Sequence, residues 1–165
     1  MKYLVLVFVI FLVFMGCTGI DCPLNNVVYT KYVVKNIDNE ADTLRDTMSV
    51  YVVRSNETEL LTVINRNLNT TSFILPISFV NDVDTFFFEF SRRDRDSSLI
   101  VSGDLVYISK TNIPHFESVD CSPNYFHQIT GVRSTHNRID TIEVNNKSVD
   151  YEEKDNFYIR FKALH

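Results

Sequence analysis

The sequence predicts an all-β protein, namely an antiparallel β-sandwich of immunoglobulin-like type with about seven to nine strands. Short runs with apolar residues at every second position recur along the chain, and turn-forming residues separate them at intervals of about 8–12 residues. No long run has the periodicity of a helix. We favour two packed sheets over a small barrel, because nothing in the pattern closes one sheet on itself.

The first half of the chain contains four expected strands, each with apolar residues on one face. Residues 36–46 are polar and acidic, so we expect a loop between the first two strands. Residues 60–68 fit a helix by the spacing of Leu61, Ile64 and Leu68, but they contain a β-branched run, and we favour a strand. Pro76 has no N–H to donate and therefore indicates an edge strand or a bulge. The expected strands are 26–34, 47–53, 60–68 and 72–77.

The strongest strand signal lies at 85–91, where Phe86, Phe88 and Phe90 share one face. The charged residues 92–96 follow it and are expected to form a hairpin tip. Two further runs flank Gly103-Asp104 and form either a hairpin or one bulged strand. The flanking runs are 99–102 and 105–110.

Residues 122–138 have the least clear pattern, although Tyr125, Phe126 and Ile129 fit one helical turn. The preceding residues, 114–121, are expected to be extended. The last expected strands are 138–144 and 157–162, and the second of these alternates cleanly between apolar and polar residues.

Residues 1–16 form an expected lipoprotein signal peptide, and Cys17 is the expected site of lipid attachment. Lys2 precedes a continuous apolar run that ends at Met15, and this run is shorter than the about 20 residues of a membrane-spanning helix. Gly16 directly before Cys17 resembles a bacterial lipobox, in which the cysteine sulfur receives a diacylglyceryl group and cleavage precedes the cysteine. An ordinary signal peptide cut elsewhere and an uncleaved anchor are the alternatives.

Cleavage before Cys17 would leave a short tether at 17–25 and a single sandwich domain at 26–165. Loss of Lys2 leaves 15 basic and 21 acidic residues, a net charge of −6. This acidic balance argues against nucleic acid and anionic lipid head groups as partners. No second apolar run of membrane length occurs, so we expect the domain to be soluble apart from its anchor.

Cys22 and Cys121 remain once Cys17 carries a lipid. We expect these two residues to form a disulfide, because an exported protein meets an oxidising compartment in which paired thiols persist. Two buried free thiols are the alternative. A catalytic thiol is the least favoured possibility, since no recognisable base lies near either cysteine in the sequence.

No motif indicates catalysis or metal binding. Asp82 and Asp84 could offer two carboxylates, but no loop dense enough in oxygen ligands for calcium surrounds them. The histidines lack the usual zinc spacing, and only His115 with His127 could meet in space. The chain has no P-loop, dinucleotide fingerprint or nucleophile elbow. We therefore expect no enzyme activity, no cofactor and no metal.

Several short motifs carry a family resemblance. A lipid-type cysteine is followed by Cys22-Pro23, then by the segment 73–77 before a phenylalanine-rich strand, and later by the segment 115–121. This layout resembles small uncharacterised lipoproteins of Bacteroidota, a family carried as a domain of unknown function. The resemblance implies a cell-envelope lipoprotein without an assigned activity, so no functional residues carry over.

We therefore expect a non-enzymatic outer-membrane lipoprotein that binds or assembles with another envelope protein through a sheet edge or face. No acidic run follows Cys17, which favours the periplasmic side of the outer membrane. One alternative is a sugar- or peptide-binding module, for which Tyr125-Phe126-His127 is the candidate aromatic loop. A less favoured alternative is an accessory hydrolase, which a buried polar triad in a pocket would support.

Overall fold

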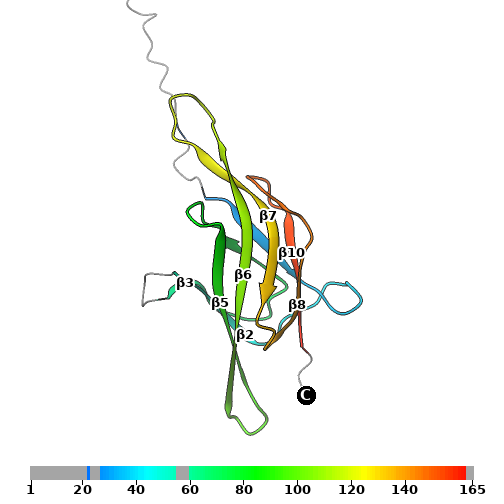
Figure 1. Cartoon of the computed structure of the whole chain (residues 1–165). Coiled ribbons are helices and arrows are strands. Elements are labelled where there is room, and N and C mark those ends of the chain that lie inside the picture. Colours follow the sequence, from blue (N-terminus) through cyan, green and yellow to red (C-terminus); the bar gives the residue numbers. More distant parts are fainter. Residues whose placement is uncertain (1–21, 23–26, 55–59, 163–165) are drawn as a thin grey trace, which may run out of the picture.

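Two β-sheets pack face to face in the computed structural model, which describes residues 22, 27–54 and 60–162 (Figure 1). The described residues contain ten strands and no helix. The predicted all-β sandwich is therefore confirmed, with more strands than the seven to nine that we expected. Cys17 and the expected signal peptide, residues 1–16, lie outside the described residues.

The larger sheet has six strands in the order β3-β2-β5-β6-β7-β9, and all neighbours in it are antiparallel. Its long central strands extend beyond the sandwich as two hairpins, whose tips lie at opposite ends of the molecule (Figure 1). The strands are β2 (Thr47–Val52), β3 (Leu61–Asn67), β5 (Val83–Arg93), β6 (Leu99–His115), β7 (Asn124–Ser134) and β9 (Ser148–Val149).

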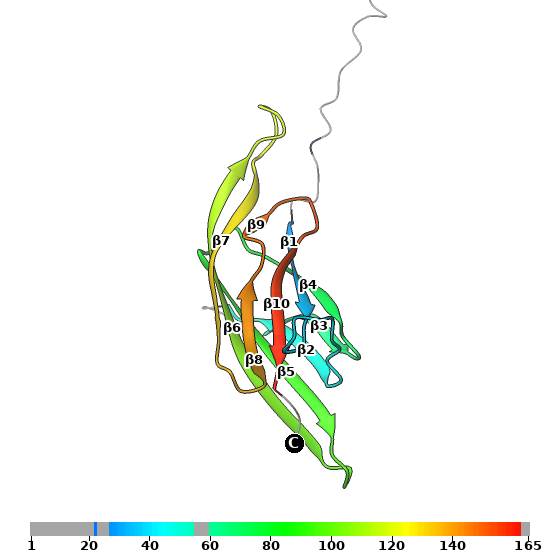
Figure 2. The same ribbon diagram turned by 90° about the vertical axis from the view of Figure 1, so that its right-hand side faces the viewer.

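The smaller sheet has the order β4-β1-β10-β8 and contains one parallel pair, β1 with β10 (Figure 2). This pair departs from the purely antiparallel prediction, and it places the first and last strands side by side. Pro76 lies in the edge strand β4, as predicted from its missing N–H. The strands are β1 (Tyr29–Val34), β4 (Ser72–Pro76), β8 (Ile139–Val144) and β10 (Asp155–Phe161).

Pairing between distant segments decides the structure around Gly103-Asp104 and at residues 125–129. The runs on either side of Gly103-Asp104 form one continuous strand, β6, rather than a hairpin. Gly103 has no room for a side chain, since a Cβ there would lie 2.5 Å from the ring of Phe87 on β5. The helical turn considered at 125–129 is wrong, because this segment pairs along β6 as part of β7. The two-residue strand β9 was missed because it is too short to show a period.

The core is organised around Tyr32, whose ring is stacked between Phe73 and Phe157 with centroid distances of 4.7 Å on each side. These three residues occupy neighbouring positions on β4, β1 and β10, so strand register produces the stack. Phe88 from the other sheet meets Tyr32 edge-on at 6.4 Å and Phe73 at 5.9 Å. Aromatic contacts of this kind join the two sheets at their centre.

Asp104 joins the sheets by hydrogen bonds. Its carboxylate lies on the inward face of β6 and accepts four bonds from the connection between β7 and β8. Burial favours the neutral acid, but the hydrogen bonds from this connection outweigh it and hold the pKa of Asp104 below its ordinary value. The donors are the Thr135 hydroxyl at 2.7 Å and the backbone N–H groups of Asn137 at 2.6 Å, Arg138 at 2.7 Å and Ile139 at 2.8 Å.

Replacement of Asp104 by Asn should destabilise the protein by about 2–4 kcal/mol, because an amide NH₂ would face donors that now meet a carboxylate oxygen. Urea unfolding measures this change in the free energy of unfolding. The same replacement at exposed Asp140, in strand β8 directly after the connection that Asp104 binds, is the matched control. It should lower the free energy of unfolding by less than about 0.5 kcal/mol. Equal effects at both positions would show that Asp104 does not hold the connection.

Candidate functional site

An open groove lies at one end of the sandwich, where the chain passes from β4 to β5. Its volume is about 1190 Å³, and it is bordered by the loop 77–82 and by the ends of β2, β3 and β7. Leu61 and Val63 of the edge strand β3 contribute one wall, and Phe79 and Val80 of the loop contribute another. The groove therefore combines an apolar rim with an accessible sheet edge.

A buried ion pair supports the loop from below. The ammonium group of Lys110 lies 3.3 Å from the Asp84 carboxylate, and both side chains are almost fully shielded from water. Lys110 also donates to the carbonyl of Asn81, and its backbone N–H donates to the carbonyl of Asp82 at 2.9 Å. The Asp84 carboxylate accepts from the Ser78 backbone N–H at 2.9 Å. The pair thus binds both ends of the segment 78–82.

Burial raises the pKa of Asp84, although the Ser78 N–H and Lys110 act in the opposite direction. Removing two charges from water costs free energy that their attraction offsets only when further hydrogen bonds satisfy them. The carbonyl of Asn81 and the N–H of Ser78 provide these bonds here. The ion pair and the loop therefore depend on each other.

Asn112 and His127 complete the support. The Asn112 amide donates to the carbonyls of Phe79 at 3.1 Å and Asn81 at 3.3 Å. This orientation leaves its oxygen to accept a hydrogen bond from Nδ1 of His127 at 2.8 Å, which assigns the proton to Nδ1. Burial, and then the nearby charge of Lys110, lower the pKa of His127 to about 4. His127 is therefore a neutral, structural imidazole near pH 7.

The loop displays apolar side chains outward as a result of this support. Phe79 is 58% exposed and Val80 is 74% exposed. The ring of Phe79 stacks on Tyr125 of β7 with a centroid distance of 5.0 Å. The polar network around Lys110 and the stacking on Tyr125 thus fix Phe79 and Val80 at the border of the groove. We call these two exposed residues the apolar ridge.

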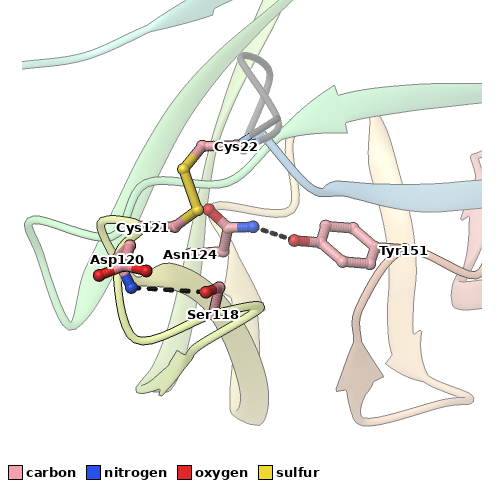
Figure 3. The surroundings of a disulfide bond; sticks show 6 residues. All are labelled: Cys22, Ser118, Asp120, Cys121, Asn124 and Tyr151. Carbon is pink, nitrogen blue, oxygen red and sulfur yellow. Dashed lines mark hydrogen bonds between the residues drawn. A yellow bond between two sulfur atoms is a disulfide. The ribbon is translucent and has the colours of Figure 1, made fainter. Parts of the chain in front are cut away.

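The predicted disulfide is present in the structure and lies near the tip of the β6–β7 hairpin (Figure 3). Cys22 and Cys121 are 99 positions apart, with a Cα–Cα distance of 5.6 Å. Asn124 lies beside this bond and donates to the Tyr151 hydroxyl. Cys121 lies three residues before β7, the strand that carries Tyr125 and His127. Cys17 lies outside the described residues.

The other candidate residues are used for packing. Asp84 turns inward to Lys110 while Asp82 is exposed, so the two carboxylates do not converge. His115 stacks on Phe126 at 4.3 Å, three positions along the β6–β7 ladder from His127 and Asn112. Within the described ranges, no group of three or more His, Cys, Asp or Glu residues could hold a metal ion. The same residues include no helix that could cross a membrane.

Sequence reasoning missed Lys110 and Asn112, although the chain contains a signal for the first. Lys110 continues the inward alternation of Val106 and Ile108, just as Asp84 continues that of Phe86. Two opposite charges in the inward phase of adjacent strands indicate a buried pair. Nothing in the sequence marks Asn112, because its role depends on the shape of the loop.

A family model matches residues 47–161, from β2 to β10, which is more than two thirds of the chain. The chain belongs to DUF6452, a family of unknown function. This result supports the predicted membership of an uncharacterised family. The matched region of the DUF6452 domain includes the ion pair, the loop and His127, whereas Cys22 and β1 precede it. No curated protein and no solved structure matches the chain.

Replacement of Lys110 by Met should destabilise the protein by about 3–5 kcal/mol, because Asp84 would remain buried without its cation. The double variant K110M/D84N should recover most of this loss, since no unpaired charge remains. Urea unfolding of the two variants gives the comparison, and the exposed Lys147→Met variant should change stability by less than about 0.5 kcal/mol. A double variant as unstable as K110M would rule out charge burial as the cause.

His127 should make stability depend on pH between its ordinary pKa of 6.5 and its native value of about 4. In this window the unfolded chain takes up a proton that the native protein does not, so stability falls as the pH falls. The loss is at most about 3 kcal/mol and should stop once the pH is below the native pKa. Unfolding curves of wild type and His127→Gln at pH 7 and 4.5 measure it, and parallel losses in both proteins would contradict the assignment.

Proposed function

We propose that this protein is a lipid-anchored cell-envelope protein of the kind found in Bacteroidota, held in the outer membrane and facing the periplasm. Its role is to bind another envelope protein rather than to catalyse a reaction. The apolar run before Gly16-Cys17 supports export and lipid attachment. The Cys22–Cys121 disulfide supports an oxidising compartment, because such bonds rarely persist in the cytosol.

The observation that carries the binding role is the supported apolar ridge beside an accessible sheet edge. Exposed Phe79 and Val80 line the same groove as Leu61 and Val63 of the edge strand β3. A partner segment in extended conformation could pair with the edge strand and place alternate side chains against the ridge. The buried network keeps the ridge in place before binding, which reduces the entropy cost of association.

The same network argues against the two alternatives. Phe79 covers the ring of Tyr125, so this tyrosine does not provide a free stacking platform for a sugar. His127 is bonded to Asn112 and Asp84 to Lys110, so the described hydrogen bonds do not join a serine, a histidine and a carboxylate in sequence. An extended apolar segment of a partner protein is therefore the occupant that we propose for the groove.

Intact-mass analysis of protein extracted from native membranes tests the anchor. We expect a chain that begins at Cys17 and carries acyl chains, together with a mass increase of two hydrogen atoms when the disulfide is reduced. A Cys17→Ser variant is the matched control and should lack the acyl mass. An unacylated wild-type chain would overturn the lipoprotein proposal.

Photo-crosslinking in intact cells tests the groove. A photoreactive residue in place of Val80 should capture one envelope protein, whereas the same residue in place of Leu99, at the far hairpin, should not. Val63→Glu should reduce the capture from position 80 by about tenfold, because a charge would replace part of the apolar wall. Identical products from positions 80 and 99, or capture that Val63→Glu does not reduce, would exclude the groove as the binding site.

A further inference from the structure

We propose that the tip of the β6–β7 hairpin rests in the surface of the bilayer that holds the lipid anchor, with Phe116 and Val119 in contact with the acyl chains. This inference rests on the proposed lipidation of Cys17. It adds a second membrane contact and a fixed orientation to the proposed function.

The first argument is the reach of the anchor. Cys121 lies within the connection between β6 and β7, and its disulfide holds Cys22 at this tip (Figure 3). Cys22 lies only five positions after Cys17, and five residue steps span at most about 18 Å in any conformation. A lipid on Cys17 therefore keeps the tip within about 18 Å of the membrane surface.

The second argument is the surface that the tip presents. Phe116 is 61% exposed and Val119 is 98% exposed, although both are apolar. The intervening Ser118 shapes the turn, because its carbonyl accepts from the Cys121 N–H at 3.3 Å and its hydroxyl accepts from the Asp120 N–H at 3.4 Å. Two apolar side chains are thus displayed on a shaped turn where a membrane is close.

The base of the hairpin is stiffened by an aromatic cluster. Phe126 stacks on His115 at 4.3 Å and meets Tyr151 edge-on at 4.9 Å. The half-exposed Tyr151 accepts a hydrogen bond from Asn124, which Figure 3 shows beside the disulfide. A tyrosine with an apolar ring and a polar hydroxyl is suited to the membrane–water interface. The cluster therefore joins the base of the hairpin to the connection between β9 and β10, which contains Tyr151.

The charged residues at the two hairpin tips indicate which tip faces the membrane and which lipid head groups it suits. No lysine or arginine occurs between residues 111 and 132, while Glu117 and Asp120 lie exposed at the tip. These carboxylates disfavour anionic head groups, so the contact is apolar and suits zwitterionic lipid. The opposite hairpin, at 92–96, has three arginines and two aspartates and lies at the far end (Figures 1 and 2). The long axis of the molecule thus has one tip without lysine or arginine, where Phe116 and Val119 are exposed, and one tip with three arginines.

The chain contains no tryptophan, so a single substitution creates a unique fluorescent reporter. The test uses the full-length lipidated protein in vesicles of phosphatidylethanolamine and phosphatidylcholine. Phe116→Trp is compared with Leu99→Trp, a matched position at the far hairpin that is 62% exposed. We expect a blue-shifted emission for F116W and quenching by brominated acyl chains at least about twofold stronger than for L99W.

Co-sedimentation with the vesicles separates the two proposals. If both variants sediment with vesicles but have the same emission and quenching, the tip contact is wrong and the lipid anchor stands. If neither sediments and the mass shows no acyl group, the anchor is wrong and the tip contact fails with it. Val119→Trp provides a second reporter in case F116W alters the fold, which a thermal melt would reveal.

Discussion

Asp104 of β6 is hydrogen-bonded to the connection between β7 and β8, through which the chain passes from the larger sheet to the smaller one. Its carboxylate on β6 gathers one hydroxyl and three consecutive backbone N–H groups from the connection that leads into β8. Without this acceptor the buried N–H of Ile139 would be unpaired, at a cost of about 1–3 kcal/mol, and the other three donors are at least partly accessible to water. Arg138 in the same connection donates to the buried Asp46 at 2.7 Å, just before β2. The position of β8, and through it of β10, depends on these contacts.

Three buried charged residues of the sandwich have the same kind of environment. Asp84, Asp104 and Lys110 all follow the inward alternation of their strands, and each accepts or donates bonds to an irregular segment. Strands supply rigid positions, while loops contain backbone groups that need partners. Asp84 and Lys110 therefore fix the connection between β4 and β5, and Asp104 fixes the one between β7 and β8. Neither connection is held by the regular hydrogen bonds of a sheet. At the groove, the buried polar residues hold the loop so that the apolar ridge remains exposed.

Alternation of apolar residues was sufficient to predict the sheets and their inward faces, because side chains in a strand point to opposite sides in turn. Phe86, Phe88 and Phe90 are buried as the pattern indicated, and the cysteine count gave the disulfide. The helical alternative for Tyr125 arose because local spacing cannot show that β6 supplies a partner for β7. The groove was not predictable, since it depends on how one loop folds over Lys110 and Asn112.

The parallel pairing of β1 with β10 places residues from the two ends of the chain in the middle of one sheet. Tyr32 cannot complete its aromatic stack until Phe157 arrives, so the smaller sheet closes only after almost the whole chain is available. Contacts of such high sequence separation form late in folding. Synthesis of the last strand therefore sets the earliest point at which the two sheets can close over a complete core.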